Sequence, residues 1–246
     1  MDSVQQGEKV MDKGAFIYEG KAKRLFETSD PNIVLIEYKD SFTAFNGEKK
    51  ATMGGKGQLN NKISANIFTY LKENGIPVHF EQQLDDIHQL ARRVTILPLE
   101  VVVRNITTGS ICKRLGIEEG LRLPRPLVEF YYKEDALGDP IVTEDHALLF
   151  GWATAEDIAE IKKLTLRVNE LLSAFFLEKG IVLVDFKLEF GKDAAGNILL
   201  ADEVSPDTCR FWDQSTGNRL DKDRFRKDLG NVLEAYEEIW RRLSGK

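Results

Sequence analysis

One stretch of the chain, residues 181–191, combines a buried strand with a charged face. It begins with the apolar run 181–184, after which apolar and charged residues alternate strictly. Because successive side chains of a strand point to opposite faces, the apolar residues predict one face that packs on a core. The other face carries Asp185, Lys187 and Glu189. The pattern therefore predicts a strand that presents an acid, a base and an acid in a row.

A return strand is predicted directly after this one. Gly196-Asn197 is a turn signal, and the segment 198–204 is apolar until it reaches Asp202. With a four-residue loop, antiparallel counting sets Glu189 opposite Asp202 on the same face. Like charges opposed in this way repel, but a divalent cation such as Mg²⁺ would reverse the effect, since Mg²⁺ is commonly held by one or two carboxylates and by substrate phosphates. A register shifted by one residue would instead give an ordinary surface hairpin with the acids on opposite faces, and the spacing leaves both open.

The rest of the pattern places strands first and mixed helices and strands afterwards. Strands are predicted at 15–18, 24–27, 33–38 and within 78–104, helices at 58–74, 110–115, 155–179 and 222–243, and an irregular segment rich in Pro and Gly at 117–150. This order indicates an α+β protein with two lobes and a cleft between them. We expect a flexible leader at 1–14, an N-terminal lobe at 15–100 and a C-terminal lobe at 101–246.

Composition narrows the class of protein. The 246 residues are 42% hydrophobic and 30% charged, which is typical of a soluble globular protein. No apolar run approaches the ~20 residues of a membrane span, so no membrane partner is expected. The net charge of −6 argues against nucleic acid as a partner. Cys112 and Cys209 lie far apart without metal-ligand spacing, and no signal peptide is apparent, which together indicate a reducing cytoplasm.

Two lysines follow the first predicted strand, in Gly20-Lys21-Ala22-Lys23. If both lie in a strand, Lys21 and Lys23 share one face, and both ammonium groups could reach one polyphosphate. The sequence contains neither a Walker A loop nor GxGxxG. Taken alone, the residues favour two solvated lysines over a phosphate site.

A candidate anion site lies at 104–110, where a strand leads into a helix. Arg104 ends the strand, and Ser110 is predicted as the N-cap of the helix. The free N–H groups and the positive dipole end of a helix bind anions, and an arginine can clamp a phosphate with two hydrogen bonds. An ordinary N-capped loop is the alternative, but the coincidence of arginine, hydroxyls, glycine and helix start favours the anion site.

The turn-rich segment 205–212 directly follows the predicted hairpin. It would project Asp207 and Arg210 into the space that the hairpin carboxylates line. Cys209 has no histidine partner in the sequence pattern, so we interpret it as a structural residue and not as a nucleophile.

Several motifs together resemble the SAICAR synthetase (phosphoribosylaminoimidazole-succinocarboxamide synthase) family. The two main segments are 97–104 with Thr108-Gly109-Ser110, and 183–191; further matches are 18–23, Phe45-Asn46-Gly47, Asn60-Asn61-Lys62 and 221–226. The motifs occur in the family's order from about residue 15 onward, and the length is that of the bacterial single-function form.

The resemblance implies a two-lobed ATP-binding fold similar to protein kinases and ATP-grasp enzymes, with ATP between the lobes. It implies a ligase that joins the carboxylate of carboxyaminoimidazole ribonucleotide (CAIR) to the amine of L-aspartate, releasing SAICAR, ADP and phosphate in purine biosynthesis. ATP would first convert the carboxylate into an acyl phosphate, which the amine then attacks. The family usually forms homo-oligomers, so these are expected here.

The resemblance also implies roles for the candidate residues. The ATP phosphates would be held by Lys21 and Lys23, and Mg²⁺ by Glu189 and Asp202. The nucleotide substrate, chiefly its phosphate, would be held by Arg104, Ser110 and Arg210. The catalytic set that orients the imidazole substituents and the carboxylate would be Asp185, Lys187 and Asp207. Lys187, flanked by two acids, should stay protonated. The adenine hinge is expected within 91–100.

Two other functions share these features. Small-molecule kinases, such as inositol-phosphate kinases, also carry Asp-x-Lys on a strand followed by metal-binding carboxylates, and they would phosphorylate a hydroxyl. A non-catalytic nucleotide-binding module is the third reading. The intact acids and lysines of the candidate site argue against such a loss of activity.

Overall fold

The computed structural model describes residues 13–44 and 48–245. The motif Phe45-Asn46-Gly47 and most of the expected leader therefore lie outside the described residues. Within the last part of that leader, the Gly14 backbone N–H donates to the Glu27 carbonyl oxygen at 2.9 Å. The fold thus already includes Gly14.

The N-terminal part of the chain forms a five-stranded antiparallel sheet in the order β1-β2-β3-β7-β6. Its strands are β1 (Phe16–Glu19), β2 (Lys23–Glu27), β3 (Ile33–Tyr38), β6 (Phe80–Gln83) and β7 (His88–Arg92). Helix α1 (Lys56–Glu73) packs on β3, β6 and β7, and the hairpin β4 (Ser41–Ala44)–β5 (Lys49–Thr52) forms a separate ribbon. The predicted strands and helix of this region are confirmed.

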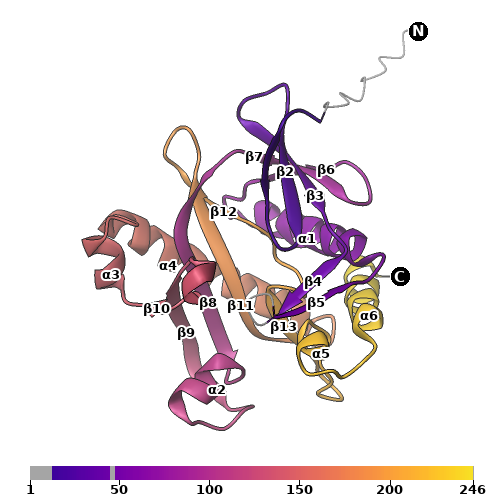
Figure 1. The fold of residues 1–246 in the computed structure, drawn as a ribbon. Coiled ribbons are helices and arrows are strands. Elements are labelled where there is room, and N and C mark those ends of the chain that lie inside the picture. Colours follow the sequence, from indigo (N-terminus) through magenta and orange to yellow (C-terminus); the bar gives the residue numbers. More distant parts are fainter. Residues whose placement is uncertain (1–12, 45–47, 246) are drawn as a thin grey trace.

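The second sheet holds the charged strand. Its order is β10-β9-β8-β11-β12, with β13 pairing to β11, and every pairing of named strands is antiparallel. Its strands are β8 (Thr95–Ile106), β9 (Arg122–Tyr132), β10 (Ile141–Val142), β11 (Ile181–Lys192), β12 (Ile198–Ala201) and β13 (Cys209–Asp213). The long helix α4 (Ala155–Leu177) packs against β8, β9, β11 and β12, as Figure 1 shows at the left of the molecule.

The hydrophobic core joins both parts of the chain. Ile63 and Phe68 of α1 belong to the same buried cluster as Phe186 and Leu188 of β11. Helix α6 (Val232–Ser244) packs against α1 and adds Tyr236 to this cluster. The first sheet contributes Phe80 of β6 to this cluster, and its other buried hydrophobic residues form two smaller clusters of their own.

The predicted register of the 181–204 hairpin is wrong by one residue. Glu189 pairs with Ala201 and not with Asp202. The strand β12 ends at Ala201, and Asp202 takes a left-handed backbone conformation with φ 62°. This conformation, uncommon for a residue other than glycine, breaks the strand alternation, so the pairing register no longer decides which way the Asp202 carboxylate points.

Residues 117–150 are more regular than predicted. They contain the eleven-residue strand β9, the short 3₁₀ helix η2 (Asp135–Leu137), β10 and helix α3 (Glu144–Leu149). Pro124 and Pro126 suggested an irregular segment. They are tolerated because the continuous pairing of β9 with β8 begins only at Leu127.

Three helices match their predicted positions and one does not. The helices predicted at 110–115 and 155–179 are α2 (Ser110–Leu115) and α4. The single helix predicted at 222–243 is instead two, α5 (Asp223–Arg226) and α6, separated by Gly230 and Asn231, both with positive φ. No helix in the described part of the chain is long and apolar enough to span a membrane.

Candidate active site

A cleft of about 1510 Å³ lies between the two sheets. All ten residues predicted for the site line it: Lys21, Lys23, Arg104, Ser110, Asp185, Lys187, Glu189, Asp202, Asp207 and Arg210. They come from the β1–β2 connection, β2, β8, α2, β11, β13 and the segment after β12. The structure therefore brings together residues that are up to 189 positions apart in the sequence, from Lys21 to Arg210.

Lys187 lies at the centre of a group of carboxylates. Its Nζ atom is 2.5 Å from Glu189 Oε1, 2.9 Å from Glu100 Oε1 and 3.6 Å from Asp202 Oδ2. Burial alone would lower the pKa of Lys187, but the three carboxylates outweigh it and hold that pKa well above its ordinary value. Lys187 is therefore a cation at neutral pH, in agreement with the sequence-based expectation, and it cannot act as a base.

Asp202 is held between two lysines. Its Oδ1 atom forms a short ion pair with Lys23, which opens β2 and is 8% exposed. Burial raises the pKa of Asp202, but Lys23 and Lys187 outweigh it and keep that pKa well below its usual range. The same pairing raises the pKa of Lys23 despite its burial. Both groups are charged, and the left-handed backbone of Asp202 places its carboxylate beside the acids and bases of β11.

The carboxylates fit a divalent cation. Glu189 uses Oε1 to accept from both Lys187 and Lys133, and its Oε2 has no hydrogen-bond partner among the described residues. Hard carboxylate oxygens are the ligands that Mg²⁺ prefers. The described residues contain no group of three or more His, Cys, Asp or Glu side chains placed to hold a metal. A metal here would thus take its other ligands from phosphates, as the sequence analysis expected.

Sequence reasoning missed two residues of this centre. Lys133, whose Nζ lies 2.8 Å from Glu189 Oε1, follows β9 in the segment that was predicted to be irregular. Burial lowers the pKa of Lys133, but the charge of Glu189 outweighs it and the pKa is raised. Glu100 lies in the quoted motif 97–104, which was the available signal, and the structure places it directly opposite Glu189 across the β8–β11 pair.

Lys21 is separated from Lys23. It lies in a bend before β2, and its Nζ atom is 2.6 Å from Asp135 Oδ1 of η2, on the opposite side of the cleft. Lys21 and Lys23 are therefore not neighbours on one strand face. Both still line the cleft, one at an exposed position and one buried.

Arg104 has an acceptor for each of its five N–H groups. Nε donates to Glu129 Oε2 at 2.8 Å, and Nη1 donates to Asp185 Oδ2 at 2.9 Å and to the Thr108 carbonyl oxygen at 3.4 Å. Nη2 donates to Ser110 Oγ at 3.0 Å and to the Tyr131 hydroxyl at 3.2 Å. A phosphate at this place would have to share these donors or displace one of their acceptors.

The predicted N-cap is wrong by one residue. Gly109 is the N-cap of α2, no side chain caps the helix, and Ser110 is its first residue. The exposed Ser110 hydroxyl accepts from Arg104 instead. Gly109 has φ 66°, and a Cβ atom there would lie 2.7 Å from Arg210 Nη2. Only glycine therefore allows the Arg210 guanidinium to approach this loop.

Arg210 uses only part of its N–H groups in bonds to the described residues. Its Nη1 donates to Asp185 Oδ2 at 2.8 Å and its Nε donates to Asp223 Oδ2 at 3.0 Å, whereas Nη2 has no acceptor among the described residues. That Nη2 lies over Gly109, beside the start of α2. The arrangement offers an anion two N–H groups together with the Ser110 hydroxyl.

The Asp207 side chain is buried to the same degree as those of Asp185 and Glu189, each 4% exposed. Its oxygens pair with Lys56, accept from Asn60 Nδ2 at 3.1 Å, and accept from the Tyr236 hydroxyl at 2.8 Å. Burial raises the pKa of Asp207, but Lys222 and Lys56 outweigh it and hold the pKa well below its usual range. Such a carboxylate is a weak base, so the structure favours an orienting role over proton transfer.

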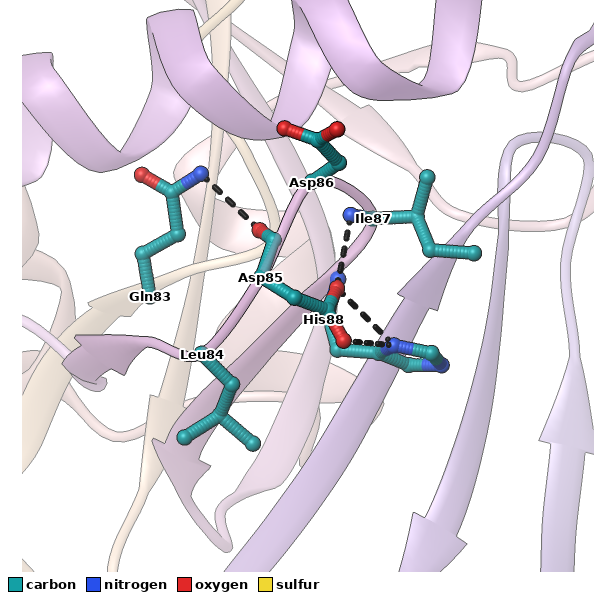
Figure 2. A pocket seen from close by; sticks show the side chains of 6 residues that line it. All are labelled: Gln83, Leu84, Asp85, Asp86, Ile87 and His88. Atoms are coloured by element: carbon teal, nitrogen blue, oxygen red, sulfur yellow. Dashed lines mark hydrogen bonds and ion pairs between the residues drawn. The ribbon is translucent and has the colours of Figure 1, made fainter. Parts of the chain in front are cut away.

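A second hollow is formed by the β6–β7 turn, residues 83–88. Figure 2 shows that Asp85 turns its carboxylate onto His88 and onto the backbone of Ile87. These contacts are within the turn itself, and none of the ten residues predicted for the site lies here. Cys209, in the cleft, is buried and without a disulfide partner, as predicted.

Residues 16–243 match the model of a protein family described as SAICAR synthetase. A phosphoribosylaminoimidazole-succinocarboxamide synthase of Brevibacillus brevis is 59% identical, over 96% of this chain and 98% of the relative. The chain belongs to the SAICAR synthetase family. A Bacillus subtilis enzyme of the same name is 56% identical over 95% of this chain and 97% of its own.

Solved structures of SAICAR synthetases share the fold. That of the Ehrlichia chaffeensis enzyme has a TM-score of 0.91 at 49% identity, covering 93% of this chain and 98% of the other. A SAICAR synthetase in complex with ADP gives 0.90 at 49% identity, covering 93% and 97%. The predicted α+β fold, with antiparallel sheets and a cleft between two lobes, is confirmed.

Proposed function

We propose that this chain joins the carboxylate of CAIR to the amine of L-aspartate at the expense of ATP, forming SAICAR, ADP and phosphate. The observation that carries the proposal is the family match over residues 16–243, which spans every candidate residue of the cleft. The reaction belongs to purine biosynthesis, and its partners are small molecules. No observation favours the small-molecule kinase reading.

The chemistry requires two steps. A carboxylate is a poor electrophile, so one of its oxygens first attacks the terminal phosphorus of ATP, forming an acyl phosphate and releasing ADP. The aspartate amine then attacks the acyl carbon and gives up a proton to water, an amide bond forms, and phosphate leaves with the bridging oxygen. Phosphoryl transfer needs mainly positioning and neutralisation of charge.

The lysines of the cleft suit this neutralisation. We propose that Lys21 and Lys23 bind the ATP phosphates and that Lys133 assists them from the opposite wall. Glu189 and Asp202 would hold Mg²⁺, which when bound polarises the phosphoryl oxygens. Lys187, a cation among carboxylates, would bind the substrate carboxylate or the transferred phosphoryl group.

The other end of the cleft suits the nucleotide substrate. Arg210 and Ser110 would bind its phosphate, next to Arg104. Asp185 accepts from both arginines, at 2.9 Å and 2.8 Å, and would fix their orientation. Asp207 would orient the imidazole substituents through its own position on the cleft wall.

The roles of the two lobes, the oligomeric state and the cellular location are also part of the proposal. We assign ATP binding mainly to residues 15–100 and substrate and metal binding to 101–246, with β8 crossing that boundary within the second sheet. The adenine hinge would lie within 91–100. A homo-oligomeric state and a cytoplasmic location complete the proposal, the latter supported by two free cysteines.

ADP release tests the function. The protein is incubated with Mg-ATP and CAIR, with and without L-aspartate. The ligase releases ADP and phosphate in proportion to aspartate. A kinase would phosphorylate its acceptor and release ADP without aspartate, and that outcome would overturn the proposal.

A further inference from the structure

Glu129 is a buried carboxylate next to the anion site that does not itself line the cleft. It lies on β9, facing β8. Its Oε2 accepts from Arg104 Nε at 2.8 Å and from the Tyr131 hydroxyl at 2.9 Å. Its Oε1 forms a short ion pair with Arg114 of α2. The Glu129 carboxylate of β9 thus connects Arg104 of β8 with Arg114 of α2, the helix that begins at the anion site.

Tyr131 completes the same cluster. Its hydroxyl accepts from Arg104 Nη2 at 3.2 Å and from Arg114 Nη1 at 3.0 Å while it donates to Glu129. Arg104 is therefore bonded at Nε and Nη2 to two groups that are themselves bonded to each other. A planar guanidinium held at two nitrogens in this way has a single orientation.

The orientation matters because Arg104 positions the anion site. Its Nη2 donates to Ser110 Oγ and its Nη1 donates to the Thr108 carbonyl oxygen, on both sides of Gly109. Rotation of the guanidinium would break these bonds and release the start of α2. The Arg114–Glu129 pair holds the same helix from its last turn.

We propose that Glu129 is a positioning residue for the nucleotide substrate: through Arg104, Tyr131 and Arg114 it fixes the loop that binds the substrate's phosphate. The inference rests on the proposed function, which places that phosphate at Arg210 and Ser110. Glu129 itself touches no substrate. Glu129 keeps the donors of Arg210 and Ser110 aligned before the phosphate binds, which lowers the free-energy cost of ordering them on binding.

Charge alone makes the opposite prediction. The cluster contains four arginines and three acids: Arg104, Arg114, Arg210, Arg226, Glu129, Asp185 and Asp223. Replacing Glu129 by glutamine makes this cluster more positive by one charge. If only Coulomb attraction mattered, an anion would bind more tightly to the variant. If the orientation of Arg104 matters, the anion binds more weakly to the variant. The sign of the change in anion affinity therefore distinguishes the two explanations.

The test compares Glu129→Gln with Glu144→Gln, which makes the same charge change at an exposed ion pair with Lys162 on the outer helix α3. For each protein, KM and kcat are measured for CAIR and for its dephosphorylated nucleoside, with KM for ATP as a reference. We expect KM for CAIR to rise about tenfold to a hundredfold in Glu129→Gln, the scale of one lost charged hydrogen bond. KM for the nucleoside and for ATP should change little, and kcat at saturation should fall less than threefold.

A general structural role would behave differently. It would raise every KM together or lower kcat and stability together, and that result would overturn the proposal, as would tighter CAIR binding. If Glu129→Gln fails to fold, Tyr131→Phe removes only the hydroxyl and should give the same selective rise. CAIR binding measured by calorimetry needs no turnover, so the positioning role is decided even if the wild-type protein shows no aspartate-dependent ADP release.

Discussion

Glu189 and Asp202 share one ammonium group, that of Lys187, although the strand register pairs Glu189 with Ala201. The left-handed backbone of Asp202 makes this possible. Two carboxylates that would otherwise repel are held close by lysines, and each lies on the wall of the cleft. In the proposed function, a cation and the ATP phosphates would enter between these residues together.

Asp202→Asn should abolish turnover and preserve the fold. Asparagine tolerates the left-handed conformation, so the backbone at φ 62° is not disturbed. The lost charge removes a proposed metal ligand, and we expect kcat to fall by at least about a hundredfold. Aspartate-dependent ADP release and the melting temperature are measured beside Asp145→Asn, an exposed control on α3. An active Asp202→Asn enzyme would remove the metal assignment.

Arg104→Ala should weaken CAIR binding with little change in ATP affinity. The substitution takes one charged partner from each of the buried carboxylates Glu129 and Asp185. Because Glu129 keeps Arg114 and Asp185 keeps Arg210, we expect the free energy of unfolding to fall by about 1.5–3 kcal/mol. Calorimetry with each ligand, below the unfolding transition, separates the two effects. An equal loss of ATP binding would show that the proposed division of the cleft is wrong.

Gly109→Ala should impair CAIR binding through Arg210. The new Cβ would lie 2.7 Å from Arg210 Nη2, which must move away from the anion site. Gly116→Ala is a control without the clash, because nothing lies within 4 Å of its added Cβ. Its left-handed backbone, with φ 64° and ψ 30°, should cost alanine about 1 kcal/mol of stability, and the Gly109 backbone, with φ 66° and ψ −128°, should cost more. A rise in KM for CAIR of equal size in the two variants would contradict the proposed role of Arg210.

Asp207 should make the protein more stable above about pH 4. Because Lys222 and Lys56 keep the folded-state pKa of Asp207 well below the unfolded value of about 3.9, its stabilisation is present above that value and is lost as pH falls toward the folded pKa. Urea unfolding of the wild type and of Asp207→Asn is compared from pH 3 to pH 7. The difference in stability should be largest near neutrality and shrink below about pH 4. A difference independent of pH would show that the Asp207 charge contributes nothing.

The sequence predicted most of the site because its chemistry lies on one regular strand. Alternation along β11 was sufficient to place Asp185, Lys187 and Glu189 on one face, and all three line the cleft. Asp202 was placed in the site on the basis of a hairpin register that is wrong. Its position depends instead on a left-handed backbone conformation, which the spacing of residues along the two strands does not reveal.

Apart from Glu100 of β8, the missing residues came from β9 and the segment after it. Prolines at its start concealed the strand, so Glu129, Tyr131 and Lys133 were not considered. The full engagement of Arg104 is equally invisible in the sequence, because its acceptors come from β9, β11, the loop before α2 and α2 itself. Contacts between distant segments, and not local patterns, decide these details.

The central claim is that ATP activates a carboxylate for attack by aspartate. The most direct measurement uses CAIR labelled with oxygen-18 in its carboxylate, Mg-ATP and L-aspartate, with mass analysis of both products. The account predicts an amide product that contains aspartate and inorganic phosphate that carries one oxygen-18 atom. Unlabelled phosphate, or a phosphorylated nucleotide that accumulates without aspartate, would contradict it.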